Sequence, residues 1–200
     1  MRPLAPASLV FAFGTTLACA TPALAMDPLC QSLMTMQAHN AKTPFHMYMT
    51  SQTTFKNAAS ARAGAQIGMA GTKKSEEIST GKDIYVLHDG KWIDMKTDPS
   101  KKADPDDEDA KASREAARCH ALPDEMVAGQ PASVYQQDNA ADGMHLKFWM
   151  SKSTHLMLKS ELTTDAGPMK QVALSTYDYK NVQAPSGAMT MQQMMQARHH

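Results

Sequence analysis

The hydrophobic pattern first becomes regular just after Asp27, where apolar residues recur at intervals of three or four. These positions are Leu29, Leu33 and Met36. Asp27 is suited to accept hydrogen bonds from free backbone amides as an N-cap, and Pro28 suits the first helical turn because it has no amide to leave unpaired. The pattern therefore predicts an amphipathic helix of about 12 residues that ends near Asn40.

From Pro44 onwards the apolar period shortens to two, which is typical of a half-buried strand. Phe45, Met47 and Met49 alternate with polar neighbours, and the alternation continues to residue 55. Residues 57–72 are small and weakly patterned, and we expect a second strand within them near residues 65–69. A polar strand is expected at residues 73–79.

Asp89 and Gly90 separate two short apolar runs, residues 84–87 and 92–95. Because both residue types tolerate the positive φ of a tight turn, this arrangement predicts a β-hairpin. The polar residues 97–109 contain two prolines and are expected to form a loop or lid. Residues 106–118 carry acids first and arginines later, which complements a helix dipole and predicts a second helix ending near Cys119.

The region after this helix again has a strand pattern. Strand-like runs are expected at residues 127–137, 144–152, 156–162 and 169–179, with turn-forming residues between them. Such short links suit consecutive antiparallel strands. The order of elements predicts an α+β fold: a strongly curved antiparallel sheet, or incomplete β-barrel, with helices packed on its concave side. Two short helices would fill that side only partly, and a solid core without a pocket is the alternative.

The first 25 residues follow a different pattern. Arg2 precedes an apolar segment, roughly residues 9–20, and Ala23-Leu24-Ala25 ends the region with small residues around a leucine. These features predict a secretory signal peptide cleaved after Ala25, hence an exported and periplasmic protein. The expected organisation is a signal peptide at 1–25, one domain at 26–185 and a Met-rich, flexible or helical tail at 186–200. A lipidated Cys19 or an uncleaved anchor is the alternative.

Charge and cysteine content narrow the function. Cleavage would leave 19 basic and 20 acidic side chains, a balance that argues against binding to nucleic acid. No later apolar run approaches the ~18 residues of a membrane-spanning helix. Two cysteines would remain, Cys30 and Cys119. An even number in an exported chain favours a disulfide, with two separate thiols as the alternative.

Motifs of known enzyme classes are missing from the sequence. It contains no G-x-S-x-G nucleophile elbow, no phosphate-binding glycine loop followed by lysine and no H-E-x-x-H zinc pattern. The acidic residues at 104–109 lack the spacing of a calcium-binding EF-hand loop. We therefore expect a protein that is not an enzyme and needs no resident cofactor.

Methionine is unusually frequent, with 17 in the whole chain. Its flexible thioether suits adaptable apolar pockets, and its soft sulfur binds cuprous copper. Most methionines fall on predicted core elements, where packing or cavity lining is expected. A separate group near the C-terminus gives a weaker alternative, a Cu(I) site, at Met189, Met191, Met194 and Met195.

Four segments of the second half resemble a known family. They are residues 127–135, 146–151, 156–161 and 177–185. Together they resemble the C-terminal half of the periplasmic lipoprotein-carrier superfamily typified by LolA and LolB. The resemblance implies an incomplete antiparallel barrel whose helices plug an apolar cavity that accepts acyl chains. The superfamily includes lipoprotein chaperones, outer-membrane receptors and envelope-stress sensors.

The leading hypothesis is therefore a periplasmic protein that binds a lipid-like or acyl ligand inside a half-barrel, in lipoprotein or lipid trafficking. The expected partners are a lipid or acylated protein cargo and an envelope membrane protein, and the chain is expected to be a monomer. An envelope-sensing interaction module is an alternative function. The residues expected to line the cavity are Leu33, Met36, Phe45, Met47, Met49, Val86, Leu146, Phe148, Leu158 and Leu174. An error of one residue in register would move any strand's residues to the opposite face.

Overall fold

The structure is a computed structural model that describes residues 27–95, 108–140 and 143–197. Within these residues the helices are α1 (Pro28–Asn40), α2 (Ala58–Gln66), α3 (Glu108–Ala116) and α4 (Met191–Ala197). The strands are β1 (Phe45–Phe55), β2 (Gly71–Ser79), β3 (Ile84–His88), β4 (Lys91–Asp94), β5 (Arg118–Val127), β6 (Gln130–Asn139), β7 (Met144–Ser151), β8 (Met157–Ala166), β9 (Met169–Asp178) and β10 (Met189–Thr190).

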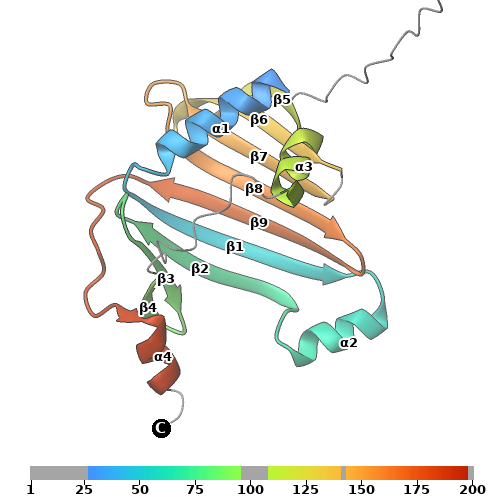
Figure 1. The fold of residues 1–200 in the computed structure, drawn as a ribbon, viewed down its shortest axis with the longest axis vertical. Helices are drawn as coiled ribbons and strands as arrows, with labels where there is room; N and C mark the ends of the chain where they lie inside the picture. The colour runs from blue at the N-terminus through green and yellow to red at the C-terminus, as the bar shows by residue number, and fades with distance from the viewer. Residues whose placement is uncertain (1–26, 96–107, 141–142, 198–200) are drawn as a thin grey trace, which may run out of the picture.

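All the described strands belong to one sheet, in the order β10-β4-β3-β2-β1-β9-β8-β7-β6-β5 (Figure 1). Neighbouring strands are antiparallel, apart from β10 and β4, which are parallel. The edge strands β5 and β10 do not pair with each other, so the sheet is open and not a closed barrel. The prediction of an α+β fold built on an incomplete barrel is confirmed.

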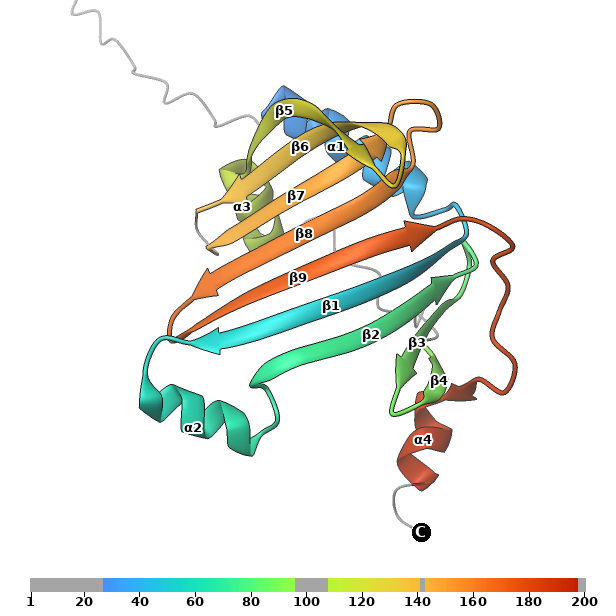
Figure 2. The same cartoon turned by 180° about the vertical axis from the view of Figure 1, so that it is seen from behind.

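Two helices, α1 and α3, lie on the same face of the sheet, in front of the strands in Figure 1. Figure 2 shows the molecule from behind, with β6 to β9 and β1 in front of α1. We call the face that carries α1 the concave face and the other the convex face. Successive residues of a strand point to opposite faces, so the strand registers assign each side chain to one of them.

The main core lies between α1 and strands β5 to β8. Leu33 of α1 and Phe148 of β7 are both 0% exposed, and Met150 is 3% exposed. Met36 and Leu146 pack against this cluster from its margin. Burial of large side chains such as Leu and Phe stabilises the fold by about 1.5–3 kcal/mol each, so this cluster accounts for much of the attachment of α1.

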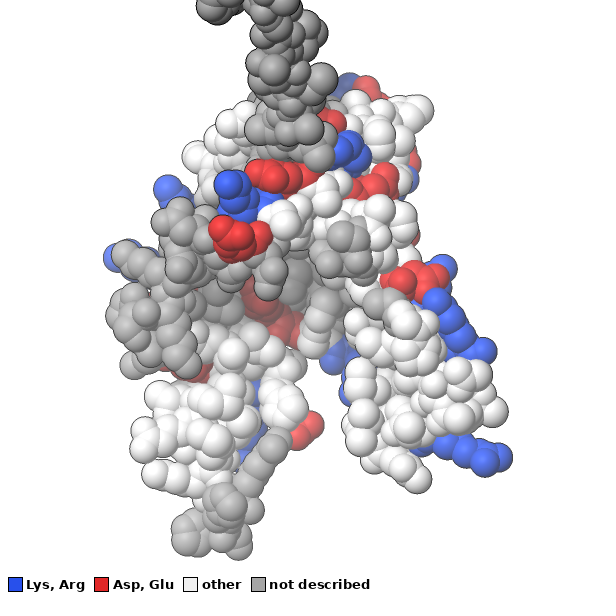
Figure 3. All heavy atoms as spheres, turned by 45° about the vertical axis from the view of Figure 1, so that its right-hand side comes forward, with Lys and Arg blue, Asp and Glu red and all other residues white. Residues whose placement is uncertain are grey.

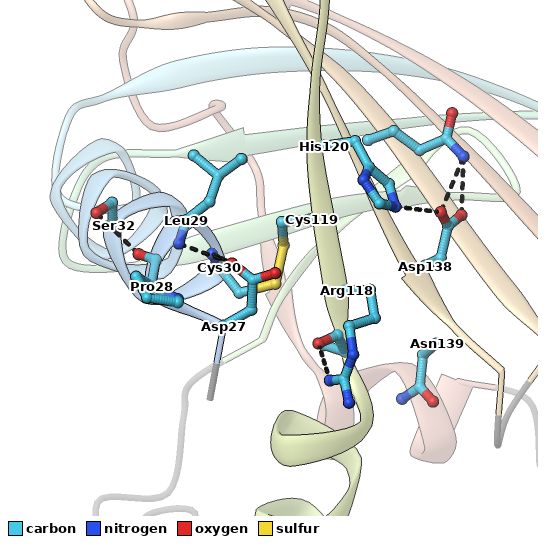
Figure 4. Close-up of a disulfide and its surroundings, with 12 residues drawn as sticks. Asp27, Pro28, Leu29, Cys30, Ser32, Arg118, Cys119, His120, Asp138 and Asn139 are labelled. Carbon is cyan, nitrogen blue, oxygen red and sulfur yellow. Dashed lines mark hydrogen bonds and ion pairs between the residues drawn. A yellow bond between two sulfur atoms is a disulfide. The ribbon is translucent and has the colours of Figure 1, made fainter. Parts of the chain in front are cut away.

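A disulfide fixes the start of α1 to the edge of the sheet (Figure 4). The Asp27 side chain accepts hydrogen bonds from the backbone amides of Leu29 and Cys30, at 2.8 and 3.4 Å. Cys30, in the first turn, is bonded to Cys119 of β5, with the two Cα atoms 5.2 Å apart. The predicted helix start and the predicted disulfide are both confirmed.

The helix predicted over residues 106–118 is present, but it ends before the predicted residue. α3 ends at Ala116, and Arg118 begins β5, a strand that the sequence analysis missed. β5 lacks a clear apolar alternation because it is an edge strand, much of it exposed. It also contains Pro123, at the place where its register with β6 shifts between Leu122 and Glu125. Proline is tolerated at edges and bulges of this kind.

The second strand expected near residues 65–69 is also wrong, because α2 extends to Gln66. The Asn57 side chain caps this helix by accepting a hydrogen bond from the Ser60 amide at 2.8 Å. Gly64 lies so close to Phe55 that a Cβ atom there would stand 2.0 Å from the ring. The alanine-rich sequence of α2 favours a helix, and the contact between Gly64 and Phe55 holds α2 at the end of β1.

The other predicted elements of the first half are confirmed. The strands at residues 45–55 and 73–79 are present, and Asp89 and Gly90 form the hairpin turn with φ of 49° and 74°. The predicted signal peptide and nearly all of the predicted 97–109 loop lie outside the described residues. Across the described ranges, no helix has the length and apolar character needed to cross a bilayer.

Candidate ligand-binding face

The concave face divides into two halves that differ in what covers them. We call β5 to β8, which lie beneath α1, the covered half, and β9 and β1 to β4 the open half. Of the described helices, α2 meets the open half at the end of β1, and α4 meets it at β4 and also contacts the adjoining β10. The middle of the open half thus has no described helix over it, and Met47 and Met49 there are half-buried.

The surface reflects this division. Figure 3 shows the molecule hollowed between the part that carries α4 and the part that carries α2. The visible side chains of both parts are mostly uncharged, with lysine and arginine along the outer side of the α2 part.

Most of the residues predicted to line a cavity do face the concave side. Phe45, Met47, Met49 and Val86 belong to the open half, where all four are half-buried. The other concave-side residues, Leu33, Met36, Leu146 and Phe148, form or border the core beneath α1. In the covered half the predicted cavity is therefore filled by the protein's own side chains.

Two of the predicted lining residues lie on the convex face. Leu174 pairs with Thr50 of β1 and Glu161 of β8, and it is 38% exposed. Leu158 is displaced by a bulge, because Trp149 pairs with Lys159 while the next residue, Met150, pairs with Met157. It packs in a convex-side cluster formed by Ala132, Val134 and Trp149. Both predictions are wrong because each strand's register was inferred without its neighbours.

A cavity of about 150 Å³ remains where the covered half meets the open half, at the C-terminal end of α1. It is lined by Gln37, Asn40, Ala41, Phe45, Met157, Tyr177 and Tyr179. The two tyrosines were not predicted as site residues. The pairing of β1 with β9 brings the Phe45 and Tyr177 rings to 5.6 Å from each other. This pairing cannot be inferred from the sequence of either strand alone.

Both tyrosine hydroxyls are held in place. The Tyr179 hydroxyl donates to the Met157 carbonyl at 2.8 Å, and the Tyr177 hydroxyl lies 3.2 Å from that of Ser160. Burial raises the pKa of both phenols, so they stay neutral. The cavity thus combines apolar walls with a few fixed hydroxyl groups, a composition common in small-molecule sites.

A row of directly paired residues crosses the open half next to this cavity. It runs from Tyr177 through Met47, Glu77 and Val86 to Ile93. Glu77 is the carboxylate in this row, and burial raises its pKa above the ordinary value for glutamate. This row of described residues therefore places one acid among apolar and aromatic neighbours.

A second cavity, of about 260 Å³, lies between the β3–β4 hairpin and α4. It is lined by Val86, His88, Ile93, Met95, Met191 and Met194. Two of the C-terminal methionines predicted as copper ligands thus meet a third, Met95, and an imidazole. Met189 lies in β10 beside Ile93, and Met195, 53% exposed, is absent from the lining.

No group of three or more His, Cys, Asp or Glu side chains is placed to hold a metal ion among the residues that the structure describes. The described titratable groups with raised pKa values on or beside the row from Tyr177 to Ile93 are Tyr177, Tyr179 and Glu77. The geometry of these groups favours binding through apolar contact with a few polar anchors.

No family model and no curated protein matches the sequence. Several solved structures match this chain at low sequence identity. They include LprF from Mycobacterium bovis, with 12% identity and a TM-score of 0.37 over 82% of this chain and 99% of that one. A domain from Vibrio parahaemolyticus described as an outer membrane lipoprotein-sorting protein has 11% identity and a TM-score of 0.28, over 80% and 93%.

The MucA/MucB complex of Pseudomonas aeruginosa is also similar, with 14% identity and a TM-score of 0.36. The match covers 82% of this chain and 60% of the matched chain, so this chain spans less than two thirds of its length. At such identities these similarities concern the fold and assign no ligand.

Proposed function

We propose that the protein is an exported, non-enzymatic binding protein that holds a lipid-like or acyl ligand on the concave face of its open half. The observation that carries the proposal is that the apolar concave-side residues of β1 are only half-buried and lead into the cavity beside α1. These residues are Phe45, Met47 and Met49. In the covered half the equivalent positions are packed tightly. The open half has the same alternation but keeps apolar surface available.

The size of the cavity limits what it can hold. A methylene group occupies about the volume of a water molecule, ~30 Å³, so 150 Å³ takes the end of a chain of about five methylenes. The rest of a longer chain would lie along Met47 and Met49. Each methylene transferred from water contributes about 0.8 kcal/mol, so a chain covering both places gains several kcal/mol.

The disulfide suits an oxidising compartment. Together with the sequence of residues 1–25 it supports export to the periplasm with cleavage after Ala25. The cargo would then be a lipid or an acylated protein, bound by a monomer.

The experiment compares two nearly isosteric changes on opposite faces. Nile red, a neutral dye that fluoresces in apolar surroundings, is titrated into the protein and displaced with dodecanol. Met47→Gln places an amide on the concave face of the open half. It is expected to weaken the binding of Nile red and of dodecanol by roughly tenfold, which corresponds to the loss of about two buried methylenes. Leu174→Gln changes the convex face and is expected to leave binding unchanged. Equal losses, or no binding by the unaltered protein, would refute the proposal.

A second candidate function is Cu(I) binding at the cavity between β4 and α4. It is favoured by the convergence of Met95, Met191, Met194 and His88 on one apolar cavity from separate parts of the chain. Thioethers and imidazole are suitable ligands for cuprous copper. The ligand set proposed here replaces two of the tail methionines, Met189 and Met195, by Met95 and His88.

Competition with a chromophoric Cu(I) chelator in the presence of ascorbate tests this candidate. The double variant Met191→Leu/Met194→Leu keeps the apolar bulk but removes two sulfurs, and it is expected to weaken Cu(I) binding at least about tenfold. Met195→Leu, on the same helix but outside the cavity, is the matched control. The same affinity in all three proteins would exclude this site.

A further inference from the structure

The carboxylate of Glu77 stands at the centre of the open half. Its Cα is paired with that of Met47 on one side and Val86 on the other, and Tyr177 lies beyond Met47 in the same row. Directly paired side chains on one face of a sheet have Cβ atoms about 5 Å apart. Glu77 is thus within reach of any ligand that covers Met47.

No hydrogen bond or ion pair to the Glu77 carboxylate occurs among the described residues, and burial is the one cause of its raised pKa. The neighbouring Glu76 provides a contrast. It points to the convex face, where its carboxylate lies 3.0 Å from His46 Nε2. Of these two adjacent acids of β2, Glu76 therefore has a hydrogen-bonding partner, whereas Glu77 has none among the described residues.

The basic groups on the same face are too far away or already paired. Lys73, paired with Ser51, lies four residues from Glu77 along β2, a separation of about 13 Å. His88, the next concave-side residue of β3 after Val86, lies 3.3 Å from the Asp89 carboxylate. Lys91, paired with His88, lies two strands and two residues from Glu77, a backbone separation of about 12 Å. Among the described residues, the protein itself supplies no cation to this acid.

We propose that the ligand of the open half is a single-chain amphiphile with a cationic, ammonium-type head group, and that Glu77 determines this specificity. The inference rests on the proposed function and names the class of its ligand. The apolar chain would occupy the β1 row and the cavity beside α1, and the ammonium group would donate hydrogen bonds to Glu77.

The chemistry follows from the surroundings of the acid. A half-buried carboxylate without a partner loses part of its hydration. A bound cation would stabilise its negative charge, and water would screen the attraction between the two charges less than it does at an exposed site. An anionic head group would meet repulsion at the same position. Hydrogen bonds between charged groups are roughly twice as strong as neutral ones, so the head group adds selectivity to an affinity that comes mainly from the chain.

Three amphiphiles with the same chain test the proposal: dodecylammonium, dodecanol and dodecanoate, each displacing Nile red below its micelle-forming concentration. The unaltered protein is expected to bind dodecylammonium roughly tenfold more tightly than dodecanoate. In Glu77→Gln this ratio is expected to fall close to one, while the affinity for dodecanol persists. Retained dodecanol binding also shows that the variant is folded.

Glu76→Gln is the matched control, because it removes the same charge from the adjacent residue on the opposite face. Its dodecylammonium preference is expected to equal that of the unaltered protein. Glu77→Lys is expected to reverse the preference in favour of dodecanoate. A preference that survives Glu77→Gln, or falls equally in Glu76→Gln, would overturn the role of Glu77 but leave the proposed function intact. Absence of dodecanol binding in the unaltered protein would overturn both.

Discussion

The two halves of the concave face have similar side chains but different cover. In the covered half, Phe148 faces α1 and is 0% exposed. In the open half, Met47 and Met49 occupy equivalent inward positions and remain half-buried. Alternation along a strand therefore identifies the inward face, whereas the position of a helix decides whether that face becomes core or stays partly exposed.

The disulfide belongs to the covered half and helps to maintain this division. It joins the first turn of α1 to β5, the edge strand of that half. The C-terminal end of α1 has no such bond, and it is there that the cavity beside Phe45 and Tyr179 remains. A helix fixed at its start and bordered by a cavity at its end leaves the junction of the two halves accessible.

Removal of the disulfide is expected to have the largest effect on stability. The bond closes a separation of 89 residues, and the loop-entropy model gives a loss of about 4–5 kcal/mol in the free energy of unfolding. Urea unfolding of the double variant Cys30→Ala/Cys119→Ala measures it. A loss below about 1 kcal/mol would mean that α1 is held on the covered half without the bond.

Truncation of one inward side chain in each half measures the contrast directly. Phe148→Ala leaves a cavity in a fully buried cluster and is expected to cost about 3–5 kcal/mol. Met49→Ala, on the half-buried row, is expected to cost about 1 kcal/mol because less contact is lost. Urea unfolding of both variants gives the comparison. Equal losses would contradict the division into core and binding surface.

Glu77 is expected to have the smallest effect, one that depends on pH. Because burial raises its pKa in the folded protein, Glu77 favours the unfolded state as pH rises from the ordinary glutamate pKa, about 4.3, through the raised value. Glu77→Gln should therefore stabilise the protein slightly at neutral pH and give no gain below the ordinary pKa. Urea unfolding across this range checks it, with Glu76→Gln as control. A gain that does not change with pH would exclude titration of Glu77 as its cause.

Much of the architecture could be predicted from the sequence, because α1, the β3–β4 hairpin and the later strands carry strong local patterns. β5 could not, since an exposed edge strand containing Pro123 shows no alternation. The candidate site was predicted in part. Phe45 and Met47 follow from alternation, whereas Tyr177, Glu77 and the bulge at Leu158 depend on registers between strands distant in sequence.

The methionines of the chain provide the most direct test of the binding face. Methyl signals of labelled methionine are recorded with and without a neutral, spin-labelled twelve-carbon amphiphile, which broadens signals near it. Met47 and Met49 lie on the proposed row, whereas Met126, 67% exposed, lies on β5, five strand spacings or about 24 Å from β1. The account predicts loss of the Met47 and Met49 signals while that of Met126 persists. Broadening of Met126 with unchanged Met47 and Met49 would contradict it.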